Sequence, residues 1–491
     1  MIGRFQGASL VLGSIAVASL VATGGVLSRG YDGGIFLSTS AGLVRGLPLY
    51  SGVWDNKDPL FYAASAGATA IMPVMAFVMD WIWIPLAGLG AFLIARRVVP
   101  MPMALMIATI VTPLLIVGPL YEPGLTSAPG TALALLCLGV LMNRWFLLAG
   151  IGIGLLIFLK IMLVPGVLLC ALAALITLRE RGAWVRLAAG LAGTVAGGIV
   201  VMLLLGWLRG YAGMLQRNAE YSSTVMTYFG YEPSWWGHLS KFTRESGAGT
   251  SMMSISAGIF LAAVVLVLIR RHAVTREQIV AVAWLGACLV GIGLLLALSY
   301  VWRHHAMAVS LVSVIAVIAI VGLVPWRPLA WTTLLATAVL VSGWTSVGHF
   351  VEHIGYRFSE WAAATLEISE YPRDARLLNT VPMSRFTYAR LGSNDDRGFL
   401  ASVRSGAELA CPDFHAYDFS PTETFSRLYE CVGTVDVVLV TDSFEEFARG
   451  VNAGNARPIL DYVDNSFGCI RLDDRRICTR VAALLGDLKG A

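Results

Sequence analysis

Long apolar stretches alternate with short polar segments from the first residues as far as Val347. Each apolar stretch is about as long as the roughly 20-residue helix that crosses a bilayer, so the pattern predicts about eleven transmembrane spans. Their predicted positions are 9–27, 79–97, 101–119, 127–143, 145–160, 161–178, 184–208, 252–270, 279–300, 306–324 and 329–347. The expected fold class is mainly α, a polytopic transmembrane helical bundle.

The segment 60–78 is also apolar, but we do not count it as a span. We interpret it as a helix that lies along the membrane surface, with Trp81 and Trp83 anchoring the start of the next span at the interface. If it crossed the bilayer, every later span would run in the opposite direction. The first outer loop therefore extends over residues 28–78.

Basic residues at the span ends set the predicted orientation. Those that fall on the same side as Arg4 are Arg96, Arg97, Arg144, Arg179, Arg181, Arg186, Arg270, Arg271, Arg276 and Arg327. Positive residues gather on the cytoplasmic side of membrane proteins, so this side and the N-terminus are expected to be cytoplasmic. An odd number of spans then places the C-terminal part outside the cytoplasm, and the expected location is a bacterial inner or plasma membrane.

The composition agrees with a membrane protein. Of the 491 residues, 57% are hydrophobic and only 13% are charged, against about a quarter in soluble domains. The net charge of +4 comes from basic residues scattered at span ends, so membrane lipids are expected partners and nucleic acid is not. The first apolar run, Leu10–Val26, lacks a small-residue cleavage site, and we expect a retained span.

The chain is expected to divide into a membrane part, 1–347, and a small extracytoplasmic α/β domain, 348–491, whose composition is that of a soluble domain. A β-branched run and the hairpin pattern near the end carry this prediction. The predicted elements are the helix Thr422–Leu428, the strand Val435–Thr441, the helix Phe444–Arg449 and a hairpin of Phe467–Leu472 with Arg476–Arg480.

The seven cysteines divide by position. Three lie inside predicted spans and are expected to be small buried hydrophobic residues: Cys137, Cys170 and Cys288. The other four, Cys411, Cys431, Cys469 and Cys478, lie in the C-terminal domain and indicate two disulfides in an oxidising compartment. Three pairings are open, and we favour Cys411–Cys431 with Cys469–Cys478. A metal site is the weaker alternative, because no two of these cysteines are separated by two residues.

One polar segment, Arg29–Tyr62, distinguishes this chain from an ordinary helical membrane protein. Acidic residues, a lysine and aromatic residues crowded at a membrane surface are costly to keep there without a function. Just after the first span, Asp32 is followed by two glycines, which allow a close approach to a ligand. Its carboxylate is a candidate general base for an acceptor hydroxyl, with a solvated loop aspartate as the alternative.

The same segment ends in the motif Trp54-Asp55-Asn56-Lys57-Asp58-Pro59-Leu60-Phe61-Tyr62. We expect Lys57 to contact a lipid phosphate, although any lysine at this depth also extends toward lipid headgroups. Asp55 and Asp58 are either acceptor or metal contacts or solvated loop acids. Pro59 fixes the entry into the interfacial helix.

Further polar positions lie at the predicted outer ends of spans. Glu122 is a second carboxylate at the outer face, which would orient the acceptor or hold a divalent metal beside the base, with a solvated turn residue as the alternative. Lys160 interrupts an otherwise apolar stretch, where an unpaired charge is costly, so a phosphate or carboxylate partner is expected. Arg303 and His304 stand at the mouth of another span, where they either bind a lipid phosphate or anchor the helix at the interface.

The order of these motifs resembles that of the GT-C superfamily of integral-membrane glycosyltransferases, in particular its protein O-mannosyltransferase and aminoarabinose transferase branch. The resemblance covers about residues 1–347. It rests on the early Asp32, the motif Gly46-Leu47-Pro48-Leu49-Tyr50 and the motif from Trp54 to Tyr62, followed by Glu122, Lys160 and Arg303 in the same order. Many members have two prolines after the lysine, whereas this chain has Asp58-Pro59, which puts the geometry of the lysine in question.

The resemblance implies inverting transfer of a sugar from a polyprenyl-phosphate-linked donor to an envelope glycan, lipid or protein acceptor at the extracytoplasmic face. Asp32 would be the catalytic base and Glu122 a second acid. The implied donor-phosphate contacts are Lys57, Lys160, Arg303 and His304, and the implied acceptor or sugar contacts are Tyr50, Asp55, Asp58 and Tyr62. Dependence on a divalent metal stays open.

Two other classes of protein are the alternatives. A transporter or lipid flippase predicts charges deep within several spans and internal repeats, whereas this sequence has Lys160 as its one evident deep charge and no repeat. A membrane-anchored assembly or binding protein would keep its activity after replacement of Asp32.

Overall fold

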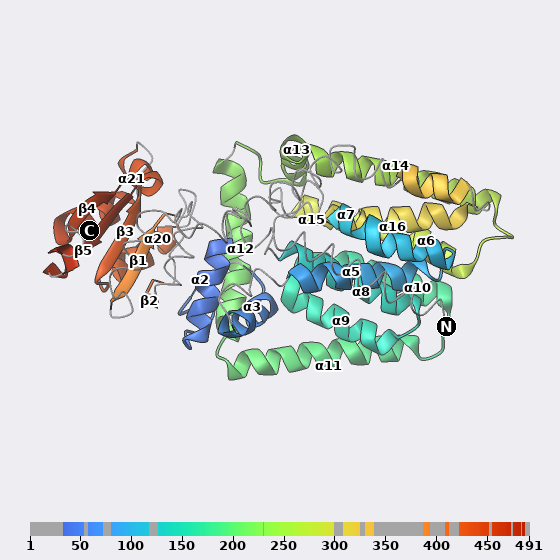
Figure 1. Cartoon of the computed structure of the whole chain (residues 1–491), viewed down its shortest axis with the longest axis horizontal. Helices are drawn as coiled ribbons and strands as arrows, with labels where there is room; N and C mark the ends of the chain where they lie inside the picture. Colours follow the sequence, from blue (N-terminus) through green and yellow to red (C-terminus); the bar gives the residue numbers. More distant parts are fainter. Residues whose placement is uncertain are drawn as a thin grey trace, which may run out of the picture. The chain divides into compact units, whose positions relative to one another are not determined.

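The structure, a computed structural model, divides the chain into two compact units, each built from separate stretches of sequence (Figure 1). The first unit holds most of the apolar helices. The second holds the first outer loop, one later helix and the C-terminal α/β domain, so the domain boundary at residue 347 stays a prediction. The described residues are 33–53, 57–71, 80–116, 126–228, 230–298, 308–324, 329–337, 386–392, 408–411, 422–450, 454–472, 475–482 and 484–486.

The first unit is a bundle of helices that, α13 apart, follow predicted spans. Its elements are α5 (Asp80–Ala95), α6 (Met101–Met106), the π-helical turn η1 (Ile107–Val111), α7 (Thr112–Ile116), α8 (Ser127–Met142), α9 (Phe146–Lys160), the 3-10 turn η2 (Ile161–Leu163), α10 (Val164–Leu178), α11 (Ala183–Leu204), α13 (Trp235–Glu245), α14 (Gly247–Ile269), α15 (Arg276–Leu298) and α16 (Ala308–Leu323). Mainly helical architecture is thus confirmed.

Among the described residues, four helical segments are long and apolar enough to cross a membrane: Phe146–Leu178, Ala183–Leu204, Gly249–Ile269 and Arg276–Leu295. The predicted count of about eleven spans therefore stays a prediction.

Small residues let the helices approach closely, as in membrane bundles generally. A Cβ added to Gly90 of α5 would lie 2.5 Å from the carbonyl carbon of Leu135 in α8, and one on Gly150 of α9 would lie 2.1 Å from the carbonyl oxygen of Leu187 in α11.

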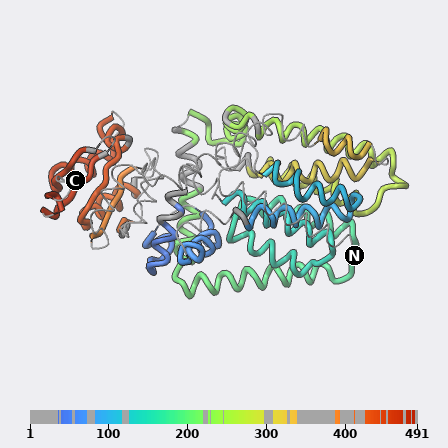
Figure 2. Tube along the Cα trace, viewed as in Figure 1, coloured from blue at the N-terminus to red at the C-terminus, as the bar shows by residue number. Residues whose placement is uncertain are grey.

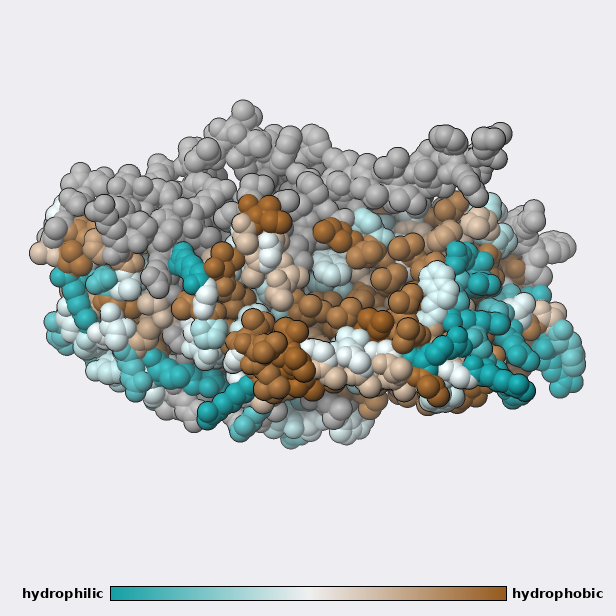
Figure 3. Space-filling view, turned by 90° about the horizontal axis from the view of Figure 1, so that it is seen from below, coloured by the Kyte–Doolittle hydropathy of each residue, from teal (hydrophilic) through white to brown (hydrophobic). Residues whose placement is uncertain are grey.

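Basic residues gather at one end of this helical unit. Arg96, after α5, donates a 2.6 Å hydrogen bond to Asn143, after α8. Arg144 pairs with Glu277 of α15 at 3.6 Å, and Arg270, after α14, donates to a carbonyl at the end of α16. Figure 3 shows hydrophilic side chains at one end of the helical part and hydrophobic ones over much of the drawn face beside them. These arginines lie together as predicted, and the side of the membrane that they face stays a prediction.

The helical part of the second unit consists of α2 (Gly33–Val44), α3 (Pro59–Ile71) and α12 (Leu208–Tyr228). Figure 2 draws α2 and α3 in blue and α12 in green, and α12 contacts the segment between α2 and α3 through Tyr211. The described part of α3 has 13 residues and is about 20 Å long. Its placement along the membrane surface stays a prediction. The stretch between the predicted spans 184–208 and 252–270, which the span pattern leaves as an outer loop of residues 209–251, contains α13 and all of α12 but its first residue.

The C-terminal region forms an α/β domain, as expected. Its elements are the strands β1 (Thr387–Leu391), β2 (Glu408–Leu409), β3 (Val437–Thr441), β4 (Gly468–Leu472) and β5 (Arg475–Thr479), and the helices α20 (Thr422–Val432), α21 (Asp442–Arg449) and α22 (Arg457–Ser466). The sheet order is β2-β1-β3-β5-β4, with β1, β2 and β3 parallel and β5 antiparallel to both neighbours. The predicted strand, hairpin and two helices are confirmed.

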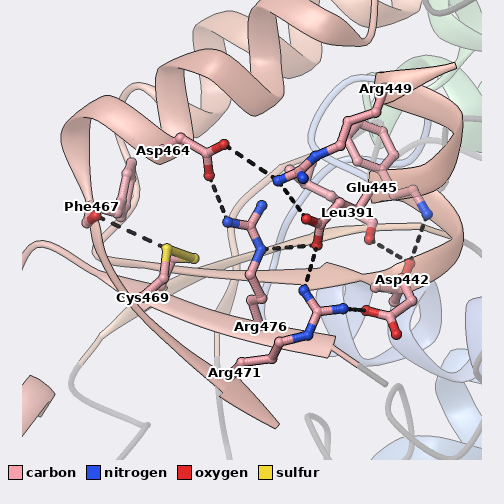
Figure 4. Close-up of polar contacts among 12 residues, drawn as sticks. Leu391, Asp442, Glu445, Arg449, Asp464, Phe467, Cys469, Arg471 and Arg476 are labelled. Atoms are coloured by element: carbon pink, nitrogen blue, oxygen red, sulfur yellow. Dashed lines mark hydrogen bonds and ion pairs between the residues drawn. A yellow bond between two sulfur atoms is a disulfide. The ribbon is translucent and has the colours of Figure 1, made fainter. Parts of the chain in front are cut away.

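Two disulfides and one ionic cluster hold this domain together. The predicted pairings are both present: Cys411–Cys431 joins the segment after β2 to α20, and Cys469–Cys478 links directly opposed residues of the hairpin. Figure 4 shows Glu445 of α21, with its side chain 9% exposed, among three arginines. These are Arg449 on the same helix, Arg471 on β4 and Arg476 on β5. The cluster ties α21 to the hairpin.

Candidate functional site

The structure describes half of the predicted site residues. Tyr50, Lys57, Asp58, Tyr62 and Lys160 are described. The remaining five lie outside the described residues: Asp32, Asp55, Glu122, Arg303 and His304. The described residues form two groups, one in each unit.

The segment before the lysine motif begins where α2 ends. Gly46 has φ +89°, a conformation that glycine adopts without strain, and the N–H of Leu47 returns to the carbonyl of Gly42 at 3.1 Å. This is the hydrogen-bond pattern of a Schellman cap, which satisfies the last carbonyls of a helix. The glycine of the Gly-x-Pro-x-Tyr motif therefore ends α2 and starts the turn.

Tyr50 closes that turn in an unusual backbone conformation. Its φ is +70°, which is rare for a bulky L-residue and costs of order 1–3 kcal/mol. The N–H of Tyr50 donates to the carbonyl of Val53 at 2.6 Å, and its hydroxyl donates to the carbonyl of Lys57 at 2.7 Å. The side chain is 6% exposed. The strain is thus balanced by hydrogen bonds and burial, and the tyrosine fixes the backbone of the lysine.

Asp58 is held by a residue from a distant helix. Tyr211 of α12 donates a 3.0 Å hydrogen bond to Oδ1 of Asp58, which is 9% exposed and directly precedes α3. A carboxylate at this position also interacts favourably with the N-terminal end of the α3 dipole. In many members of the superfamily that the sequence resembles, this position holds the first of two prolines. Here it holds an aspartate that accepts a hydrogen bond from α12.

Burial raises the pKa of the Tyr211 hydroxyl well above its ordinary value, and the negative charge and hydrogen bond of Asp58 add to this shift. Tyr211 consequently stays protonated at every physiological pH, as a hydrogen-bond donor to a carboxylate must.

Lys57 itself is half-buried. Its Nζ lies 5.5 Å from the centroid of the Phe36 ring of α2, a cation–π contact. Phe61 and Tyr62 of α3 complete this aromatic group, with ring centroids 5.1 Å and 6.1 Å from that of Phe36. Tyr62 is fully buried and contributes to packing, and its contact with an acceptor or sugar stays a prediction.

Lys160 lies in the first unit, at the end opposite the arginines. The chain leaves helical geometry at Lys160, with φ −161° and ψ 74°, where the predicted spans 145–160 and 161–178 meet. The ammonium is 7% exposed and donates a 2.8 Å hydrogen bond to Oγ1 of Thr126, which precedes α8. Gly130 makes room for this side chain, because a Cβ there would lie 2.8 Å from Cβ of Lys160. A cation at the C-terminus of α9 also fits the helix dipole.

A small cavity opens beside this ammonium. Two hydroxyl groups on its wall, those of Ser127 and Thr131, are buried and have no hydrogen-bond partner among the residues that the structure describes. The rest of the described lining is apolar apart from Lys160: Met162, Leu163, Leu295 and Ala308. The cavity thus combines a cation and two hydroxyls that are ready to bond with walls that favour a hydrocarbon chain.

Sequence reasoning missed Tyr211, Ser127 and Thr131. Tyr211 fell in a predicted loop, and no local pattern connects it to Asp58, which lies 153 positions earlier. Ser127 and Thr131 are four residues apart at the start of an apolar span, which places both on one helix face, and this signal was available.

Metal ligands were left open by the sequence. Within the described ranges, no group of three or more His, Cys, Asp or Glu side chains is arranged to hold a metal ion. Asp55 and Glu122 are outside those ranges, so the structure does not bear on their part in metal binding.

Comparisons with known proteins address the fold. No protein-family model matches the sequence, and no curated protein is significantly similar to it. Among solved structures, the chain is similar to ArnT from Cupriavidus metallidurans bound to undecaprenyl phosphate, with a TM-score of 0.52 and 14% identity over 97% of each chain. The apo state of ArnT gives a TM-score of 0.49 at 15% identity, over 97% of this chain and 99% of ArnT.

The archaeal oligosaccharyltransferase AglB from Archaeoglobus fulgidus, in complex with an inhibitory peptide and a dolichol-phosphate, gives a TM-score of 0.46 at 13% identity. That alignment covers 96% of this chain and 73% of AglB. The similarity to ArnT in its complex with undecaprenyl phosphate shows that this chain has a GT-C-like fold. Because that alignment covers 97% of both chains, the similarity extends beyond residue 347 into the C-terminal domain. The chain is an integral membrane protein of this fold class.

Proposed function

We propose that the protein is a glycosyltransferase that moves a sugar from a polyprenyl-phosphate-linked donor to an envelope glycan, lipid or protein acceptor. The observation that carries this proposal is the cavity beside Lys160. It offers a buried ammonium and two available hydroxyls next to apolar walls. The described cavity has a volume of about 10 Å³, room for about one water molecule, so the lipid phosphate is proposed to meet these groups at the mouth of the cavity, with its tail between helices.

The physical reason for the choice of ligand is the low polarity around Lys160. An ammonium removed from water interacts strongly with an anion, because little solvent screens the attraction. Ser127 and Thr131, whose hydroxyls have no hydrogen-bond partner among the described residues, would then donate to phosphate oxygens. A neutral sugar or a hydrocarbon chain would not have this electrostatic attraction to the ammonium.

The proposed reaction is a single displacement. The acceptor oxygen attacks the anomeric carbon, the bond between that carbon and the phosphate oxygen breaks, and the acceptor proton passes to Asp32 as general base. Negative charge develops on the departing phosphate, where Lys57, Lys160, Arg303 and His304 are the proposed stabilising groups. Attack from the face opposite the leaving phosphate inverts the anomeric centre.

The remaining predicted residues are assigned around this reaction. Glu122 is proposed as a second acid that orients the acceptor, and Asp55 as an acceptor or metal contact. Tyr50, Asp58 and Tyr62 are buried, and the first two hold the lysine motif through their hydrogen bonds to the Lys57 carbonyl and the Tyr211 hydroxyl. We place the reaction at the extracytoplasmic face, because Lys160 lies at the helix ends opposite the arginine-rich end.

Transfer assays test this function. The full-length protein is reconstituted in lipid nanodiscs with a panel of radiolabelled polyprenyl-phosphate sugars and an envelope fraction from the source cells as acceptor. We expect transfer from one donor class, a loss of at least about 100-fold with Asp32→Asn, and retained binding of undecaprenyl phosphate. Asp461→Asn, an exposed aspartate of α22, is the matched control and should transfer at the wild-type rate.

Two results would contradict the proposal. Absence of undecaprenyl phosphate binding by the wild type would remove the lipid-phosphate donor. Full transfer by Asp32→Asn would remove the proposed base and leave the donor assignment intact.

A further inference from the structure

We propose that Tyr211 is a positioning residue for Lys57, which it holds through Asp58 and Tyr50 so that the ammonium meets the donor phosphate in one fixed direction. This inference rests on the proposed function, in which Lys57 contacts that phosphate. It adds α12, a helix more than 150 positions away in sequence, to the machinery of the first outer loop.

The first connection runs through Asp58, the direct neighbour of Lys57. Its Oδ1 accepts the 3.0 Å hydrogen bond from the Tyr211 hydroxyl, and both side chains are buried, at 9% and 6% exposed. A hydrogen bond to a buried carboxylate is stronger than one between neutral groups. Its loss would leave a poorly solvated carboxylate and release the backbone on the C-terminal side of Lys57.

The second connection runs through Tyr50. The Tyr211 ring packs against the Tyr50 ring with a centroid distance of 5.9 Å, and the Tyr50 hydroxyl donates to the carbonyl of Lys57 at 2.7 Å. Tyr50 keeps its strained φ of +70° only if its surroundings hold it there. Gly210 contributes to this, because α12 comes so close that a Cβ there would lie 2.7 Å from Cβ of Tyr50.

The two connections act on neighbouring residues, one on the Lys57 carbonyl and the other on the Asp58 side chain. The carbonyl of Lys57 is bonded by Tyr50, and the following residue is bonded by Tyr211, so the backbone that carries the lysine is fixed at consecutive positions. The side chain then leaves this backbone over the Phe36 ring. A flexible lysine gains from such preorganisation, because less conformational freedom is lost when the phosphate binds.

Chemical labelling tests the positional link without any donor. The full-length protein in nanodiscs is treated with an acylating reagent, and the acylation rate of Lys57 is measured by peptide mass spectrometry. Tyr211→Phe keeps the ring and removes only the hydroxyl, and we expect Lys57 to be acylated at least about threefold faster as its segment loosens. Tyr429→Phe, a tyrosine of α20 at 42% exposure, is the control and should leave the rate unchanged.

Binding of undecaprenyl phosphate tests the functional link. We expect Lys57→Gln to weaken binding about tenfold and Tyr211→Phe about fivefold, and the double variant to bind no more weakly than Lys57→Gln alone, within about twofold. Such non-additivity identifies a residue that acts through the lysine, which a general loss of stability would not produce.

The outcomes separate the two proposals. Unchanged labelling of Lys57 in Tyr211→Phe, or additive losses in the double variant, overturns the positioning role while the donor assignment stands. Faster labelling together with no binding of undecaprenyl phosphate by the wild type overturns the proposed function and with it the role of the lysine, leaving only the structural link.

Discussion

Nζ of Lys160 donates a 2.8 Å hydrogen bond to Oγ1 of Thr126 and so joins the end of α9 to the start of α8. Burying an ammonium is costly even when it is hydrogen-bonded to a hydroxyl, because water solvates the charge better. The helix dipole of α9 offsets part of this cost. We therefore expect Lys160 to contribute to binding of the lipid phosphate.

Lys160→Met should therefore weaken binding of the lipid phosphate. Methionine fills a similar volume without charge, so the affinity for undecaprenyl phosphate should fall at least about tenfold. Lys241→Met, which removes another buried ammonium of the same unit (Lys241 is 1% exposed, on α13), is the matched control and should keep the affinity. Equal loss of affinity in both variants would contradict a specific role for Lys160.

Gly210→Ala should weaken the contact between α12 and the turn at Tyr50. The new methyl would lie 2.7 Å from Cβ of Tyr50, so one of the two must move, at an expected cost of about 1–3 kcal/mol. The control is Gly213→Ala on the same helix, where a Cβ meets no atom of the described residues within 4 Å. That variant should be neutral or stabilising by up to about 1 kcal/mol, since alanine favours helix. The unfolding temperatures of the two variants check this pair of predictions. A change of the same sign in both unfolding temperatures would refute the close contact.

The stability of α13 should depend on pH through His238. Burial and the positive charge of Lys241 lower the pKa of His238. The unfolded state then binds a proton at a higher pH than the folded state. The stability contributed by the neutral imidazole is thus fully present above the unfolded pKa of about 6.5 and is lost as the pH falls through the lowered folded pKa.

Hydrogen exchange of α13 between pH 7.5 and pH 5 measures this dependence, with His238→Gln as the comparison. Protection relative to the variant should decrease toward low pH. A wild-type protein whose protection parallels that of the variant at every pH would show that His238 does not carry the effect.

Glu445→Gln should loosen the hairpin of the C-terminal domain. It removes the carboxylate that Arg449, Arg471 and Arg476 share, while Arg476 keeps its 2.6 Å contact with Asp464. Because two of the arginines are exposed, we expect the free energy of opening of the hairpin to fall by only about 2 kcal/mol. Hydrogen exchange in β4 and β5 should then be roughly 30-fold faster. Glu446→Gln, at the exposed neighbouring position, should change nothing, and equal effects of the two variants would argue against the cluster.

Local patterns in the sequence were enough to predict several parts of the fold. The run Val435–Thr441 is β-branched and lies between polar segments, and it forms the buried central strand β3, Val437–Thr441. The two favoured disulfides follow from the four cysteines and the hairpin pattern, because a hairpin brings Cys469 and Cys478 opposite each other. Apolar length likewise located the described helices of the first unit other than α13.

The loop 209–251 shows where local patterns failed. Its residues include Tyr211 and form the helices α12 and α13, whose polar character resembles that of a loop when no partner surface is known. Such a helix is stabilised by what it packs against, which in the case of α12 includes the turn at Tyr50 and the carboxylate of Asp58.

The sequence by itself determined which chemical groups this protein carries at its membrane surface, because residue type and apolar length are local properties. Only the tertiary structure decided which of those groups meet. The pairing of Tyr211 with Asp58, and of the Ser127 and Thr131 hydroxyls with the cavity at Lys160, depends on helix packing between segments far apart in the chain. Such contacts arise from long-range burial and shape, for which no spacing rule along the sequence exists.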